Sequence, residues 1–83
     1  MSSNMRKADQ FKPIILDIVY RSETPLKRFV VHYILWNIGV SGFPPKDGGA
    51  FQCAIDELVA DGKISTIKTA RGTTLSKVIR QVA

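Results

Sequence analysis

The sequence predicts a small α+β domain, mainly α, with a core of three helices followed by a C-terminal two-stranded β-hairpin. Apolar residues recur at helical spacing in three segments that precede Gly62. After Gly62 the chain becomes rich in β-branched residues, which is typical of strands. The 83 residues suffice for one domain but not for two. We therefore expect a polar N-terminal tail over residues 1–8 and a single domain over residues 9–83.

The first helix is expected to start near Lys12 and to end around Ser22. Apolar residues between these limits follow helical spacing. Pro13 fits only in the first turn of a helix, where its missing N–H costs no hydrogen bond. Asp9 is a suitable cap just before that turn.

The second helix is expected to begin at Thr24-Pro25, a good N-cap followed by a residue suited to the first helical position. Gly39 is a plausible C-terminal cap. The segment from Val40 to Gly49 contains three glycines and two prolines and is expected to be a loop. The helix should bury one apolar stripe, formed by Leu26, Phe29, Val30, Tyr33 and Ile34.

This second helix has more apolar residues than one stripe can accommodate. Exposed contiguous apolar surface usually marks an interface. We therefore expect a homodimer or partner interface, and its candidate residues are Ile14, Val31, Leu35 and Trp36. The alternative is that the Phe43-Pro-Pro loop and the first helix cover part of this surface.

The third helix is expected over residues 48–61, with Asp47 as its cap and Gly62 as a left-handed stop. Its core face is Phe51, Ala54, Ile55, Leu58 and Val59.

A strand is expected over residues 63–69, followed by a turn over residues 70–72. The stretch 73–82 fits two structures. Its β-branched content favours a returning strand, whereas its apolar spacing also fits a helix. The strand is favoured, since the preceding turn can close a hairpin.

The positive charge is concentrated at the C-terminal end of the chain. The formal net charge is +5. Before Gly62 seven basic residues balance seven acidic ones, and after it there are five basic residues and no acid. A segment of one sign is a candidate contact surface for a polyanion. The alternative is a solvated, charged hairpin that keeps the protein soluble.

The segment from Ala54 to Ile64 resembles the end of the recognition helix and the first wing strand of winged-helix domains. In that family the positions of Ile55 and Leu58 are core, the glycine at Gly62 closes the helix, and the apolar residue at Ile64 starts the strand. The resemblance implies that the third helix enters a major groove of DNA while the wing follows the phosphate backbone or a minor groove.

The candidate contacts to nucleic acid follow from this resemblance and from the charge. Arg71 lies in the turn itself, and Gln52 is the best candidate for reading a base edge. Asp56 and Glu57, on the outward face of the same helix, are expected to oppose phosphate. The full set of candidates is Lys46, Gly49, Gln52, Lys63, Lys68, Arg71 and Lys77.

Nothing in the sequence indicates an enzyme, a cofactor, a metal site or a small-molecule substrate. His32 is the one histidine and has no metal-ligand partner at helical spacing, so a surface or half-buried structural role is expected. Cys53 is the one cysteine, which excludes an intrachain disulfide.

These observations favour a small, basic DNA-binding protein, a transcriptional regulator that contacts duplex DNA mainly through its wing. The alternative is a winged-helix protein-interaction module, such as an inhibitor or adaptor of a larger complex. RNA binding is a third option, disfavoured because the strands lack interleaved aromatic residues. With no signal peptide and no membrane span expected, the predicted location is the cytoplasm or the nucleoid rather than outside the cell.

Overall fold

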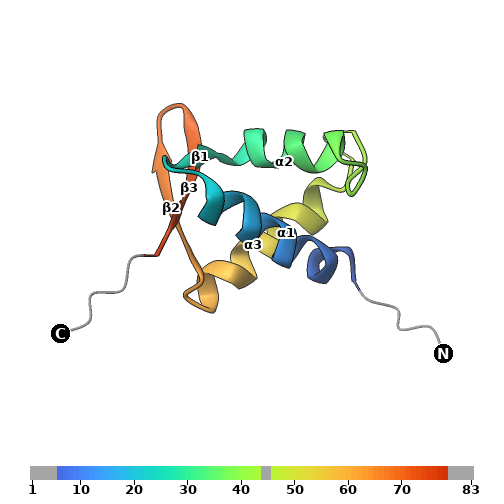
Figure 1. Cartoon of the computed structure of the whole chain (residues 1–83), viewed down its shortest axis with the longest axis horizontal. Helices are drawn as coiled ribbons and strands as arrows, with labels where there is room; N and C mark the ends of the chain where they lie inside the picture. The colour runs from blue at the N-terminus through green and yellow to red at the C-terminus, as the bar shows by residue number, and fades with distance from the viewer. Residues whose placement is uncertain (1–5, 44–45, 79–83) are drawn as a thin grey trace.

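The computed structural model describes residues 6–43 and 46–78 and has an α+β fold with three helices and a three-stranded antiparallel sheet. The helices pack together at one end, and the sheet stands at the other (Figure 1). None of the helices in these ranges is long and apolar enough to cross a bilayer. The elements are α1 (Lys7–Arg21), β1 (Leu26–Lys27), α2 (Arg28–Asn37), α3 (Gly48–Ala60), β2 (Ile64–Thr69) and β3 (Gly72–Lys77).

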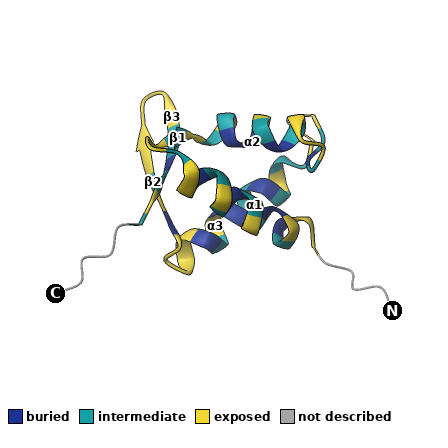
Figure 2. Cartoon of the chain, viewed as in Figure 1, coloured by how far each residue is buried: buried dark blue, intermediate teal, exposed yellow. Residues whose placement is uncertain are grey.

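The core lies where the three helices meet and continues to the inner face of the sheet. Phe11 and Ile15 of α1 and Phe51 of α3 are fully buried, as is Leu75 of β3. Figure 2 shows dark blue segments where the helices cross, whereas the far end of the hairpin is exposed. The side chains at the hairpin turn are therefore exposed to solvent rather than packed against the core.

Helix α1 starts earlier than the sequence indicated. It begins at Lys7 rather than near Lys12, so Ala8, placed in the polar tail by sequence, is helical and buried. Pro13 lies inside the helix, where it forfeits one backbone hydrogen bond. Burial of the α1 face offsets that loss, because Phe11 and Ile15 lie on the two sides of the proline in the core.

The sheet has three strands, which corrects the expected two-stranded hairpin. Its strand order is β1-β3-β2, and both pairs are antiparallel. The added strand is the two-residue segment β1, in which Leu26 faces Leu75 and Lys27 faces Thr74. The expected cap at Thr24 is consequently wrong: the chain stays extended past it, and α2 begins at Arg28.

The buried face of α2 also differs from the expected stripe. Val31 and Leu35 are completely buried, whereas Phe29 is 64% exposed and Tyr33 is 52% exposed. β1 fixes the start of α2 against the sheet, so the helix is rotated about its axis relative to the expectation. The sequence could not indicate this rotation, because α2 has apolar residues on all sides. Val31 and Leu35 are core residues and cannot form the expected partner interface. Ile14 and Trp36, the other two candidates, are half-buried.

Helix α3 and the hairpin agree closely with the sequence-based expectation. Gly62 has a φ of 73°, the left-handed conformation expected of a helix stop. Of the expected core face, Val59 alone is not buried, being 37% exposed. Residues 72–77 form a strand rather than a helix. The expectation for residues 79–82 lies outside the described residues.

Tyr20, near the end of α1, connects this helix to both strands at the base of the hairpin. Its hydroxyl donates a hydrogen bond to the carbonyl of Lys63 at 2.6 Å and accepts one from the amide of Val78 at 3.3 Å. These two residues flank β2 and β3, so one side chain satisfies a polar backbone group from each strand end. The hairpin is thereby fixed at its base and free at its turn.

We predict that the two sides of α2 respond oppositely to truncation. Leu35→Ala should destabilise the domain by about 2–5 kcal/mol, since it removes a fully buried side chain. Phe29→Ala, the matched control on the exposed side, should change the free energy of unfolding by about 0.5 kcal/mol or less. Urea unfolding of dilute protein followed by circular dichroism measures both. A larger loss for Phe29→Ala would contradict the observed rotation of α2.

Candidate nucleic-acid interface

The turn of the hairpin presents Arg71 at the free end of the sheet. Thr69 pairs with Gly72, which leaves Ala70 and Arg71 as a two-residue turn. The hydroxyl of Thr69 accepts a hydrogen bond from the Arg71 amide at 3.2 Å and donates one to the Gly72 carbonyl at 3.1 Å. Gly72 has a φ of 125°, which residues with side chains rarely adopt. The backbone is thus ordered while the Arg71 side chain projects into solvent.

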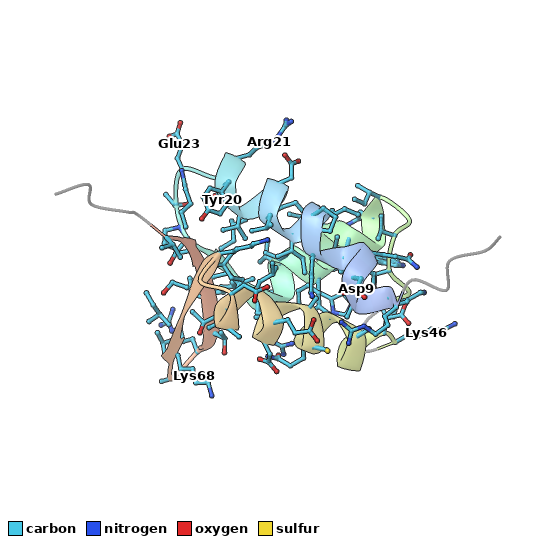
Figure 3. The ribbon with its side chains drawn as sticks, turned by 90° about the horizontal axis from the view of Figure 1, so that it is seen from below. Asp9, Tyr20, Arg21, Glu23, Lys46 and Lys68 are labelled. Atoms are coloured by element: carbon cyan, nitrogen blue, oxygen red, sulfur yellow. The ribbon has the colours of Figure 1, made fainter. Side chains whose placement is uncertain are left out.

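Lys68 lies between this turn and α3. It pairs with Thr73 on the sheet face that also includes Thr66 and Leu75. With Gln52 and Asp56 of α3, Lys68 lines a shallow groove of about 270 Å³ between the helix and the hairpin. Figure 3 shows Lys68 at the edge of the molecule, on the side opposite Arg21 and Glu23. The ammonium group is therefore available to a ligand that spans α3 and the hairpin.

The N-terminal end of α3 lies at the opposite end of the helix from Lys68. Lys46 is exposed, and Figure 3 places it at the opposite end of α3 from Lys68. Asp47 precedes the helix in a left-handed conformation with a φ of 65° and makes no side-chain cap. Its carboxylate instead accepts a hydrogen bond from the Gly42 amide at 2.7 Å and an ion pair from Lys7 at 3.1 Å. Both contacts hold the pKa of Asp47 below its usual value, the Gly42 amide more strongly.

The amides at the start of α3 consequently have no side-chain cap from Asp47, which corrects the expected capping role. Gly49 is exposed in the first turn of the helix, beside Gly48. Backbone N–H groups at a helix N-terminus are suited to anions. The helix start and Lys46 thus remain compatible with a phosphate contact.

Glu57 is expected from the sequence to oppose phosphate, but in the structure cations from the region of α1 neutralise it. It forms ion pairs with Arg6 at 2.9 Å and with Lys12. Asp9 binds the same two cations, at 2.9 Å from Arg6 and 3.2 Å from Lys12. Hydrogen bonds from Arg6 and then from Lys12 hold the pKa of Glu57 at about 2, and the same two residues hold that of Asp9 at about 2. This four-residue cluster neutralises Glu57, one of the two acids of α3 that are expected to oppose phosphate.

Cys53 lies beside this cluster rather than on a reactive surface. Its thiol donates a hydrogen bond to Glu57 at 3.2 Å. The adjacent carboxylate and partial burial raise the pKa of Cys53, which disfavours the thiolate needed for nucleophilic chemistry. Within the described ranges no group of His, Cys, Asp and Glu side chains is arranged to hold a metal ion.

Asp56 is the acid of α3 that lines the groove beside Lys68. It accepts a hydrogen bond from the side-chain amide of Gln52 at 2.8 Å. The one candidate base-reading side chain is therefore engaged within its own helix. No ion pair to Asp56 is present among the described residues, so its charge is left beside Lys68 in the groove.

The structure separates the candidate contacts into two groups. Lys68 and Arg71 lie toward the free end of the hairpin, whereas Lys63 precedes β2 and Lys77 pairs with Ile64 at the base. A six-residue strand is roughly 17 Å long, so the two groups lie about that far apart. Lys63 lines a hollow with Asp17 and Tyr20 of α1 rather than with α3. All four cations are exposed, and in the described part of the chain none forms an ion pair.

His32, expected at or near the surface, is buried with 6% exposure. Its ring stacks on Phe51 with 4.4 Å between centroids, and Nε2 lies 2.9 Å from the Ser41 hydroxyl. Because that hydroxyl donates to the Gly42 carbonyl, Nε2 carries the proton and donates to Ser41. Burial, then the charge of Arg28, lower the pKa of His32, so the ring is neutral at pH 7. This contact joins α2 to Ser41, which follows the helix, and an isolated histidine in the sequence gave no signal of it.

We predict that Lys12→Met raises the pH of acid unfolding. Carboxylates with depressed pKa values stabilise the fold fully above about pH 4.5 and lose that contribution as the pH falls towards about 2. The variant should melt below the wild type at neutral pH, and the difference should shrink as the pH approaches 2. Arg21→Met, which breaks the exposed pair with Asp17, is the control and should change little. A melting difference that is constant with pH would show that the cluster has no such role.

The site thus consists of two cations near the hairpin turn, the exposed side of α3 and Lys46 at its N-terminal end. No family model, curated protein or solved structure matches the chain.

Proposed function

We propose that this protein is a winged-helix protein that binds duplex DNA and acts as a transcriptional regulator. Its three helices and antiparallel sheet are compatible with the winged-helix fold, with β2 and β3 as the wing. The observation that supports the proposal most is the distribution of ion pairs. Cations on and near α1 are neutralised by acids, whereas Lys68 and Arg71 make no ion pair with any described residue.

Affinity in this proposal comes mainly from phosphate contacts by the wing. Arg71 and Lys68 engage one stretch of backbone, while Lys46 and the start of α3 engage another along the same side of the molecule. Each phosphate neutralised by a cation releases counterions, which makes binding strongly dependent on salt. The engagement of Gln52 by Asp56 limits base reading, so the proposal favours weak sequence preference.

A second candidate function is a protein-interaction module, such as an inhibitor or adaptor of a larger complex. It is favoured by the same Gln52–Asp56 pair, which puts an acid where a DNA-reading helix usually has donors. A fold of this type serves both roles, so the fold does not decide between them. Polarisation titrations with random duplex DNA at two salt concentrations distinguish them. Tight, salt-sensitive binding supports the first function. Absence of binding near physiological salt, together with a protein partner recovered in a pull-down, supports the second.

We predict that Lys68→Ala/Arg71→Ala weakens binding to every duplex tested. Each lost phosphate contact should reduce the slope of log K against log salt by roughly 0.9, so the double variant should lose about 2 from the slope. Arg21→Ala removes one positive charge from the opposite side of the molecule and should leave the slope unchanged. Fluorescence polarisation over a salt series measures all three proteins. Equal affinity of the double variant and the wild type would rule out the wing as the binding surface.

We also predict that the basic residues at the base of the hairpin contribute less than those near its turn. Lys63→Ala should reduce affinity by a smaller factor than Lys68→Ala, because Lys63 faces α1 rather than the side formed by α3 and the hairpin. Both variants change the net charge equally, so they form a matched pair. The same polarisation assay compares them, and a larger loss for Lys63→Ala would move the interface to the base of the sheet.

A further inference from the structure

Helix α3 presents an oriented hydrogen-bond acceptor to the groove that it forms with the hairpin. Gln52 and Asp56 are one helical turn apart, and both line this groove. The side-chain nitrogen Nε2 of Gln52 lies 2.8 Å from a carboxylate oxygen of Asp56. An ionised carboxylate can only accept hydrogen bonds, so the nitrogen of the Gln52 amide, and not its oxygen, faces Asp56. This contact determines how the amide is turned and leaves its oxygen Oε1 as an acceptor.

Asp56 adds a second acceptor to the same groove. Its side chain is exposed and, among the described residues, forms no ion pair. One carboxylate oxygen binds Gln52, which leaves the other able to accept a further hydrogen bond. Lys68 lines the groove with these two residues, and its positive charge offsets the repulsion between Asp56 and a polyanion. Asp56 can therefore approach nucleic acid, because a cation accompanies it.

We propose that the Gln52–Asp56 pair selects cytosine in the major groove of DNA, an inference that rests on the proposed DNA-binding function. On its major-groove edge cytosine offers the N4 amino group as a donor and has no acceptor. Oε1 of Gln52 and the second oxygen of Asp56 both match that donor. Guanine presents acceptors at O6 and N7, and thymine presents one at O4, so both of these bases are opposed by the pair.

Adenine, the usual partner of a glutamine, is also disfavoured. It is read by a bidentate contact in which the glutamine oxygen accepts from N6 and the glutamine nitrogen donates to N7. In this molecule Nε2 of Gln52 already has a carboxylate oxygen of Asp56 at 2.8 Å. A contact to N7 would bring that negative charge beside another acceptor. The hydrogen bond within α3 thus restricts reading to one base, which is consistent with a weak overall sequence preference.

Selection from a library of duplexes with a randomised centre, followed by sequencing of the bound fraction, tests this assignment. The wild type should enrich cytosine at one position by about fivefold over each other base. Asp56→Asn preserves the shape of the side chain, but its amide can present a donor, so the variant should lose this preference. Asp61→Asn is the matched control: it removes the same charge at the end of α3, outside the groove, and should keep the preference.

A second variant tests the other member of the pair. Gln52→Met keeps the length of the side chain but removes its acceptor, and it should also reduce the cytosine preference. Neither Gln52 nor Asp56 is buried, and circular dichroism checks that the variants fold.

The outcomes separate this inference from the function on which it rests. A wild type that binds duplexes without enriching cytosine overturns the inference and leaves DNA binding intact. An unchanged cytosine preference in Asp56→Asn or in Gln52→Met overturns it as well. If no duplex is bound even at low salt, the DNA-binding function fails and the inference fails with it.

Discussion

The pairing of β1 with β3 determines how α2 and the hairpin are oriented in the fold. Only two residues long, β1 places Leu26 opposite Leu75, a fully buried residue of the hairpin. This contact joins the start of α2 to the sheet. It thereby fixes the rotation of α2, which buries Val31 and Leu35 and leaves Phe29 and Tyr33 exposed. The same contact holds the hairpin against the helices, so that its turn projects away from them (Figure 1).

Charge is distributed by tertiary contacts as much as by sequence. Arg6 and Lys12 of the N-terminal region bind Glu57, which lies in α3 more than forty residues later. This cluster neutralises acids that would otherwise lie near a bound polyanion. As a result, the uncompensated cations of the described chain include those near the hairpin turn, and Asp56 remains as the opposing charge on that side. The balance between Lys68, Arg71 and Asp56 therefore decides how strongly the side formed by α3 and the hairpin attracts phosphate.

The sequence predicted the α3–hairpin half of the fold well and the α2 half poorly, for identifiable reasons. A regular apolar period and a glycine stop at Gly62 defined α3, and β-branched residues defined the hairpin. Helix α2 has apolar residues on all sides, so periodicity could not give its rotation. Thr24-Pro25 has the composition of a helix start, yet the chain there is extended, because β1 is stabilised by pairing with β3, a strand far along the sequence. No local pattern reveals such a pairing.

The sequence identified the residue types of the candidate site better than their positions relative to one another. The excess of cations after Gly62 identified Lys68 and Arg71, but only the strand register separated them from Lys63 and Lys77. The roles of Glu57, His32 and Tyr20 depend on contacts between distant segments and had no signal in the sequence.

The most direct test of the central claim is an NMR titration of the backbone amides with a short random DNA duplex. If the side formed by α3 and the wing binds phosphate, the largest shifts should occur at Lys68 and Arg71 and in the first turns of α3, with little change around Lys63. Shifts centred on α1 or on the exposed side of α2, or no shifts at all at low salt, would contradict the account.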